Sequence, residues 1–242
     1  MVEETSIGGP AGEFPETWWS RILGAREAPE RARALLEELL ATYWKPLHFH
    51  ARRRGLDVEA AKDAVQGFIA HLLGQDFLAR LDPERGRLRS YLRTAADRYL
   101  ATLREGRTAQ KRGGGARVRS LDFDVAEEDL KRDASGTPES AFEREWAHEV
   151  MERALAELRG EFEAGRRTGS FDVVLRFFRE VEPPSYAEAA AACGLSPTRF
   201  KMVLHRARER FRRLVRDQVA RTVEDEGDVD AEIEELMRAL GR

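Results

Sequence analysis

Hydrophobic residues recur along most of this chain at the spacing of an α-helix. Steps of one and three residues put the apolar side chains of each run on a single helix face. No segment has the two-residue alternation that is typical of a half-buried strand. The pattern therefore predicts an all-α protein. The clearest runs in the first half of the chain are 35–47, 64–73 and 88–103.

One interruption of this pattern divides the chain into two predicted helical domains. The periodicity stops at three consecutive glycines, residues 113–115, and resumes after Pro138. The residues between are acidic and include turn formers, so we expect a flexible linker. The predicted organisation is a disordered N-terminus at 1–13, a first domain at 14–112, a linker at 113–137, a second domain at 138–220 and an acidic amphipathic tail at 221–242.

Residues 185–215 have the pattern of a helix-turn-helix. A short alanine-rich helix ends near Gly194, which suits a tight turn, and Ser196 and Pro197 are residues that favour the start of a second helix. A buried stripe on that helix leaves other side chains on its outer face. In DNA-binding proteins such a helix enters the major groove. The residues predicted to contact DNA are Thr198, Arg199, Lys201, Met202, His205 and Arg206.

Charge is arranged in blocks, which the net charge of −3 conceals. Residues 85–119 hold eleven Lys and Arg against two acids, and residues 196–216 hold eight against one. Between and after them lie two acidic blocks, with ten acids against three bases in 122–149 and eight against three in 221–242. Concentrated basic blocks are typical of a protein that binds a polyanion such as nucleic acid.

Other features argue against secretion and membrane insertion. Cys193 is the only cysteine, so the chain has neither a disulfide framework nor a cysteine-based zinc site. No apolar run approaches the ~20 residues of a transmembrane helix. The first residues lack the basic start and apolar stretch of a signal peptide. We therefore expect a cytoplasmic protein that does not contact a membrane.

The residues also give no sign of catalysis. Gly113–Gly115 lacks the Lys-Ser/Thr pair of a phosphate-binding loop. His48 and His50 are two residues apart, so they point to different helix faces and do not form a metal-binding pair. We expect no enzymatic activity, no cofactor, no metal site and no small-molecule substrate.

Four motifs together resemble one family. The first domain contains DAVQGFIAHLL at 63–73 and LDPERGRLRSYL at 81–92, followed by a basic helix and AQKRGGG at 109–115. The second domain contains LSPTRFKMVLHRAR at 195–208. In this order they resemble the extracytoplasmic-function sigma factors, the small members of the bacterial sigma-70 family. The resemblance runs from Phe14 to about Gln218, although Gly67 stands where many members carry a glutamate.

The resemblance implies a function and roles for particular residues. The protein would direct bacterial core RNA polymerase to promoter DNA and assist DNA opening at transcription initiation. The second domain would read the −35 element. The residues expected to bind core polymerase are Asp63, Val65, Gln66 and Phe68. The residues expected to bind the −10 element are Arg87, Arg89, Arg93, Arg98, Arg104, Arg107, Lys111 and Arg112. Whether an anti-sigma factor also binds stays open.

The residues alone leave other functions open. The helix-turn-helix would also suit a stand-alone transcriptional regulator, although the basic block in the first domain is unusual for an effector or dimerisation domain. The basic blocks would also allow an RNA-binding adaptor, which the helix-turn-helix disfavours. The tail forms an apolar face that could pack on its own domain or dock on a basic surface, with Ile233, Leu236, Met237 and Leu240 along it.

Overall fold

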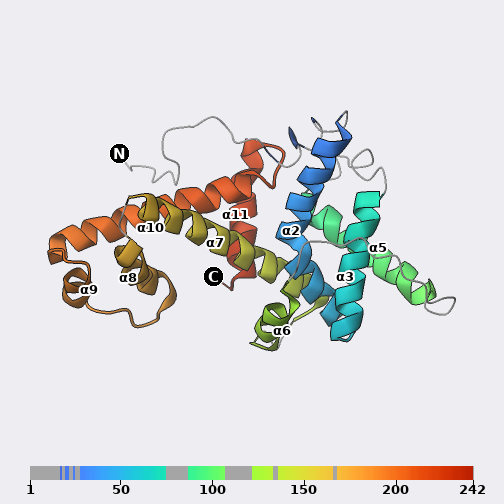
Figure 1. The fold of residues 1–242 in the computed structure, drawn as a ribbon, viewed down its shortest axis with the longest axis horizontal. Coiled ribbons are helices and arrows are strands. Elements are labelled where there is room, and N and C mark those ends of the chain that lie inside the picture. The colour runs from blue at the N-terminus through green and yellow to red at the C-terminus, as the bar shows by residue number, and fades with distance from the viewer. Residues whose placement is uncertain are drawn as a thin grey trace. The chain divides into compact units, whose positions relative to one another are not determined.

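The computed structural model describes residues 17, 20, 21, 24, 28–74, 87–106, 122–132, 136–165 and 168–241, and most of these residues are helical (Figure 1). The all-α prediction is confirmed for this part of the chain. In chain order the α-helices are α2 (Pro29–Arg53), α3 (Val58–Gly74), α5 (Leu88–Gly106), α6 (Phe123–Arg132), α7 (Pro138–Ala164), α8 (Thr168–Arg179), α9 (Tyr186–Ala192), α10 (Pro197–Ala220) and α11 (Val229–Ala239), with a short 3₁₀ turn, η2 (Glu226–Asp228), before the last.

The described helices belong to two compact units. The smaller unit is Val150–Gln218, and the larger consists of Pro15–Glu149 together with Val219–Arg242. The boundary falls inside α7, and the last residues of α10 also belong to the larger unit. The tail helix α11 is therefore part of the same unit as α5.

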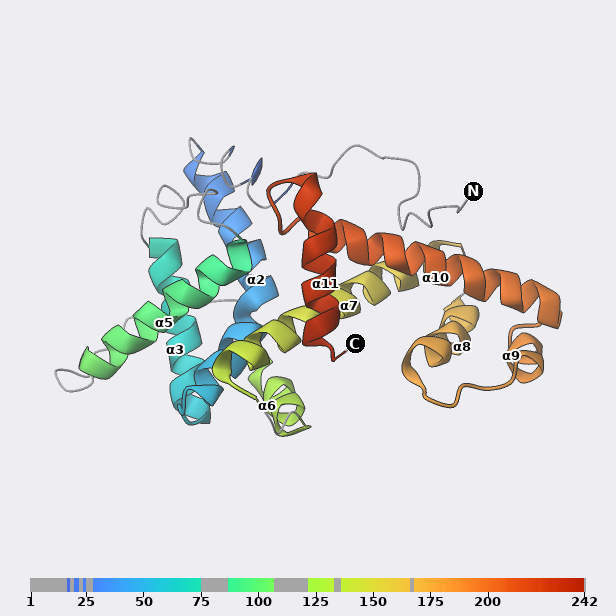
Figure 2. The ribbon, with the colours of Figure 1, turned by 180° about the vertical axis from the view of Figure 1, so that it is seen from behind.

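The larger unit is built around α2, α3 and α5, which pack side by side (Figure 2). Their apolar stripes bury side chains such as Leu39, Tyr43, Ile69 and Leu92, each at most 1% exposed. These are the runs that the periodicity predicts, because a helix of this kind gains most of its stability by burying one apolar face.

The predicted flexible linker contains a helix of this unit. Residues 123–132 form α6, which contacts α2. Phe123 and Ala126 are buried, and the Phe123 ring lies edge-on to Trp44 with 5.1 Å between centroids. The linker prediction is therefore wrong for these residues. Apolar residues three apart give α6 a buried face. The acids around them make the segment resemble a linker by composition.

Polar contacts also fix α6 on α2. The Nε2 atom of His48 lies 2.7 Å from Oε1 of Glu127, and Nε of Arg52 donates to the same carboxylate oxygen at 2.7 Å. His48 is completely buried. Burial lowers the pKa of His48, and the nearby Glu127 opposes this only in part.

The buried His48 predicts a pH dependence of stability. Its pKa is lower in the folded state than in the unfolded state, so the unfolded chain binds more protons and the free energy of unfolding falls as the pH drops through about 6.5. Urea titrations at several pH values should give a shallower dependence for His48→Gln than for the wild type. The exposed His205→Gln variant is the control and should keep the wild-type slope. Equal slopes for all three proteins would contradict the prediction.

The smaller unit has a core of its own. The second half of α7 supplies Ala154 and Leu158, and α8 supplies Phe171 and Val174. These side chains meet the buried alanines of α9 and the stripe predicted on α10. The buried members of that stripe are Phe200, Leu204, Ala207, Phe211 and Leu214, and Val203 and Val215 pack beside them. This core holds α9 and α10 in place without any residue of the exposed α10 face.

Candidate nucleic-acid interface

Hydrogen bonds fix the start of α9, the turn that follows α9 and the start of α10. Ser185 and Glu188 form a reciprocal capping box at the start of α9, which satisfies two backbone donors. Gly194 follows α9 with a φ of +64°, a conformation that costs glycine little. The N–H of Leu195 then bonds the carbonyl of Ala190 at 2.9 Å. The hydroxyl of Ser196 accepts from the N–H of Arg199 at 3.4 Å at the start of α10.

The outer face of α10 carries every residue that the helix-turn-helix pattern predicts to contact DNA. All six side chains are exposed, and so is Arg208 on the next turn. The buried residues Phe200, Leu204 and Ala207 lie on the opposite stripe, so the packing of the helix determines which side chains face outward. The face combines cations with one apolar group, Met202, which is 51% exposed. The predicted set is Thr198, Arg199, Lys201, Met202, His205 and Arg206.

One further residue beside this face was not predicted. Tyr186, at the start of α9, is 41% exposed, and its ring stacks on Phe177 of α8 with 5.6 Å between centroids. The ammonium of Lys201 lies 4.9 Å from the centroid of the same ring. Tyr186 therefore orients Lys201. Only the packing of three helices brings these residues together, so no local sequence signal could have indicated the contact.

The predicted polymerase-binding residues of α3 divide into two groups. Asp63 and Gln66 are exposed, whereas Val65 and Phe68 are each only 3% exposed and pack inside the larger unit. The prediction that Val65 and Phe68 contact a partner therefore does not agree with this structure. Their spacing put them on the apolar stripe of α3, and that stripe faces α2 and α5.

Gly67 of α3 lies under an aromatic ring of α5. A Cβ atom at Gly67 would stand 2.4 Å from the hydroxyl oxygen of Tyr99, so a larger residue there would displace the ring. Tyr99 also packs against Phe68 at 5.6 Å between centroids and is half-buried, and this burial raises the pKa of its hydroxyl. This contact favours a residue without a side chain at position 67.

The predicted −10 residues of α5 differ in their exposure. Arg98 and Arg104 are exposed. Arg87 and Arg93 are partly exposed, and Arg89 is only 3% exposed. The rest of the predicted set, Arg107, Lys111 and Arg112, lies outside the described residues.

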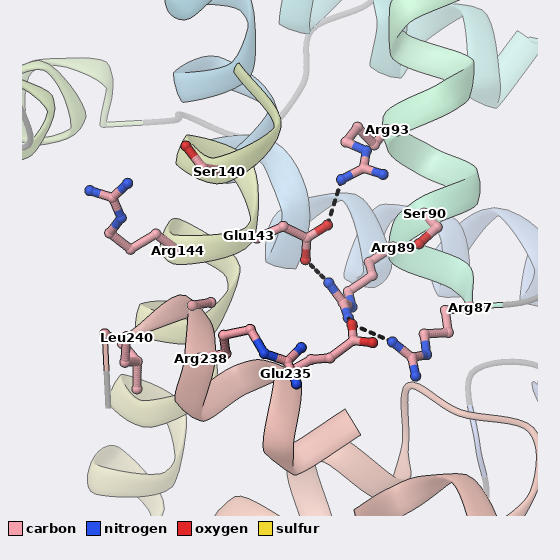
Figure 3. Close-up of a pocket in the computed structure, with 12 residues that line it drawn as sticks. Arg87, Arg89, Ser90, Arg93, Ser140, Glu143, Arg144, Glu235, Arg238 and Leu240 are labelled. Carbon is pink, nitrogen blue, oxygen red and sulfur yellow. Dashed lines mark hydrogen bonds and ion pairs between the residues drawn. The ribbon is translucent and has the colours of Figure 1, made fainter. Parts of the chain in front are cut away.

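Arg89 is the centre of an ion-pair cluster between α5, α7 and α11 (Figure 3). Its guanidinium binds Glu232 through two hydrogen bonds, of 2.6 Å from Nε and 3.2 Å from Nη2. It also pairs with Glu143 of α7 and Glu235 of α11. It lies over the ring of Trp146 with 4.3 Å to the centroid. The sequence indicates that the acidic tail could dock on a basic surface, but it does not single out these acids as partners of Arg89.

Arg87 and Arg93 extend this cluster. Nε of Arg87 lies 2.9 Å from Oε2 of Glu232, and Arg87 also pairs with Glu235. Nη1 of Arg93 donates to Oε1 of Glu143 at 2.7 Å. Burial alone would raise the pKa of Glu235, but hydrogen bonds from Arg87 and Arg89 bring the pKa below its usual value. The three arginines are thus engaged by three carboxylates.

A groove of about 850 Å³ lies beside the cluster. Arginines line it from three helices, with Arg144 on α7 and Arg238 on α11 in addition to those of α5. In Figure 3 the Arg144 side chain points away from the cluster. Its lining includes five arginines and two glutamates, so the groove suits a charged chain better than an apolar small molecule.

Comparison with known protein families, with curated proteins and with solved structures finds no match for this chain. Among the described residues, no three His, Cys, Asp or Glu side chains lie close enough together to hold a metal ion. None of the described helices is both long and apolar enough to cross a membrane.

Proposed function

We propose that this protein is a bacterial RNA polymerase sigma factor of the extracytoplasmic-function type, which directs core polymerase to promoters. The observation that supports the proposal is the exposed face of α10, which follows α9 and the turn at Gly194. All six side chains expected to read DNA are exposed on α10, and the buried residues lie on its other side. This arrangement suits a helix that enters the major groove.

The chemistry of the α10 face fits duplex DNA. Arg199 and Lys201 lie on the first two turns, where a recognition helix faces base edges, and such cations can bond the O6 and N7 atoms of guanine. Met202 offers an apolar contact for a thymine methyl group. Arg206 and Arg208 follow one to two turns later, where a helix tracks phosphates. This unit would read the −35 element.

The larger unit supplies what a stand-alone regulator would not need. Asp63 and Gln66 are exposed polar residues on α3, and α5 carries the exposed cations Arg98 and Arg104. The first pair would contact core polymerase and the second pair the −10 strand. With both units held on polymerase, the second DNA contact becomes intramolecular, so neither unit needs to bind DNA tightly alone.

Co-elution with core polymerase tests the proposal. The full-length protein should elute with purified bacterial core RNA polymerase in size-exclusion chromatography. The Asp63→Ala/Gln66→Ala variant should lose at least about tenfold in affinity, because removing two central polar contacts costs about 1.4 kcal/mol or more.

The control variant is Glu30→Ala/Glu128→Ala, which alters two exposed residues of the same unit. It should co-elute like the wild type. Failure of the wild-type protein to bind polymerase, together with tight binding to duplex DNA, would overturn the proposal in favour of a stand-alone transcriptional regulator.

A further inference from the structure

A helix of opposite charge covers the arginines at the start of α5. Glu232 and Glu235 of α11 bind Arg87 and Arg89, and Glu232 has no exposed surface. Arg89 is 3% exposed, so it cannot reach another ligand while α11 is in place. The contacts of Arg89 with these two acids join residues that are 143 and 146 positions apart in the chain.

The acids of α11 make the contacts that a phosphate chain would make. A guanidinium binds a carboxylate or a phosphate through the same pair of parallel N–H donors. Glu232 receives two hydrogen bonds from Arg89 in this way and a further contact from Arg87. The carboxylates of α11 thus occupy the sites where phosphate oxygens of a nucleic-acid strand would bind these arginines.

Arg89 keeps two of its partners without α11. Glu143 and the Trp146 ring both belong to α7, and both contact the guanidinium. Release of α11 would therefore leave Arg89 oriented, with Arg87 beside it and with Arg93 and Arg144, which line the same groove, nearby. A surface already organised in this way loses little side-chain entropy when it binds a strand.

The helix itself is short and is anchored by few apolar residues. It has 11 residues, of which Val229 and Leu236 are buried apolar side chains. Met237, on the predicted apolar face, is 37% exposed. Short terminal elements with little buried apolar surface open at a lower free energy than the core of a protein. α11 can therefore be released while α2, α3 and α5 stay folded.

We propose that α11 and single-stranded DNA compete for Arg87 and Arg89, so that α11 covers a second strand-binding surface in the free protein. In this state the exposed cations of α5 are Arg98 and Arg104. Strand capture displaces α11 and frees the partly exposed Arg87 and the buried Arg89 from the α11 carboxylates. The inference rests on the proposed function, because it assumes that α5 is the helix that captures the opened strand.

A charge-neutralising variant of the full-length protein tests this competition. Glu232→Gln/Glu235→Gln removes the two charges that face the arginines. Its matched control, Glu224→Gln/Glu234→Gln, removes two charges from exposed positions of the same tail. Fluorescence anisotropy with a labelled single-stranded oligonucleotide of about 12 nucleotides measures the affinity of each protein at several salt concentrations.

The first variant should bind the oligonucleotide about tenfold more tightly than the wild type, with a steeper salt dependence. The slope of log K against log salt should increase by about 0.7 for each arginine that gains a phosphate. The control should stay within about twofold of the wild type, because its charges are exposed and screened by salt. Equal affinities for the two variants would overturn the inference.

Hydrogen exchange on the wild-type protein gives a second test that needs no substitution. Backbone amides of residues 229–240 should lose protection when the oligonucleotide is added, while those of α3 keep it. Unchanged protection of α11 at saturating oligonucleotide would also overturn the inference.

The polymerase experiment separates the two proposals. In one outcome the wild-type protein co-elutes with core polymerase, but Glu232→Gln/Glu235→Gln does not change strand binding. This outcome would support the sigma function and contradict the competition. Tighter strand binding by the same variant, without polymerase binding, would support the competition and remove the sigma function.

Discussion

Replacing Phe200 with alanine should lower the free energy of unfolding of the smaller unit by about 3–5 kcal/mol. The Phe200 side chain has no exposed surface and lies in the core formed by α7, α8, α9 and α10. Its ring lies 5.5 Å from that of Phe177, measured between centroids. The truncation leaves a cavity where α9 and α10 meet, and surrounding helices held by their other contacts can fill it only in part.

Urea denaturation followed by circular dichroism would measure this loss. Met202→Ala is the control, because Met202 lies two residues away on the exposed face of the same helix, and it should change stability by about 0.5 kcal/mol or less. A loss below about 1 kcal/mol for Phe200→Ala would mean that the core does not depend on this ring. The comparison also separates folding from DNA binding, since only Met202 belongs to the proposed reading face.

Replacing Arg89 with methionine should destabilise the larger unit by about 3 kcal/mol. Removing one partner of a buried ion pair leaves the other charge without compensation, which typically costs about 3–5 kcal/mol. The lower end applies here, because Arg87 still contacts Glu232 and Arg93 still contacts Glu143. Three carboxylates would then face two cations, and the Trp146 ring would lose the guanidinium that lies over it.

Tryptophan fluorescence suits this measurement, because all four tryptophans belong to Pro15–Glu149. Arg98→Met is the control, since Arg98 is an exposed cation of the same helix, and it should change stability by about 0.5 kcal/mol or less. The stability loss of Arg89→Lys should lie between those of Arg89→Met and Arg98→Met, because lysine keeps the charge but lacks the planar pair of donors. Similar stabilities for Arg89→Met and Arg98→Met would show that the cluster adds nothing to the fold.

Sequence could predict the α9–α10 region because the signals there are local. Gly194, Ser196 and Pro197 act on their own turn of the chain, and the buried stripe of α10 follows from a period of 3.6 residues. The side chains of α10 that do not belong to this buried stripe form its exposed face. The structure therefore agrees with the predicted exposure of all six reading residues.

The parts that sequence missed depend on contacts between distant segments. Composition suggested a linker where α6 lies, because its two buried apolar residues, Phe123 and Ala126, stand among acids. The burial of Arg89 depends on Glu232, which is 143 positions away, and no pattern within one helix carries that information. A basic helix looks the same in sequence whether its cations face solvent or an acidic helix of the same chain.

The contact between Gly67 and Tyr99 makes the two positions interdependent. A side chain at position 67 would occupy the space that the Tyr99 hydroxyl now fills, so a glutamate there requires a smaller residue at position 99. We expect the two positions to covary among homologous sequences, with glycine paired with tyrosine and larger residues paired with small ones. A larger residue at position 67 with Tyr99 unchanged would clash with the Tyr99 ring. Positions 67 and 99 therefore act as one unit in the packing of α3 against α5, and substitutions at this contact should be made at both positions together.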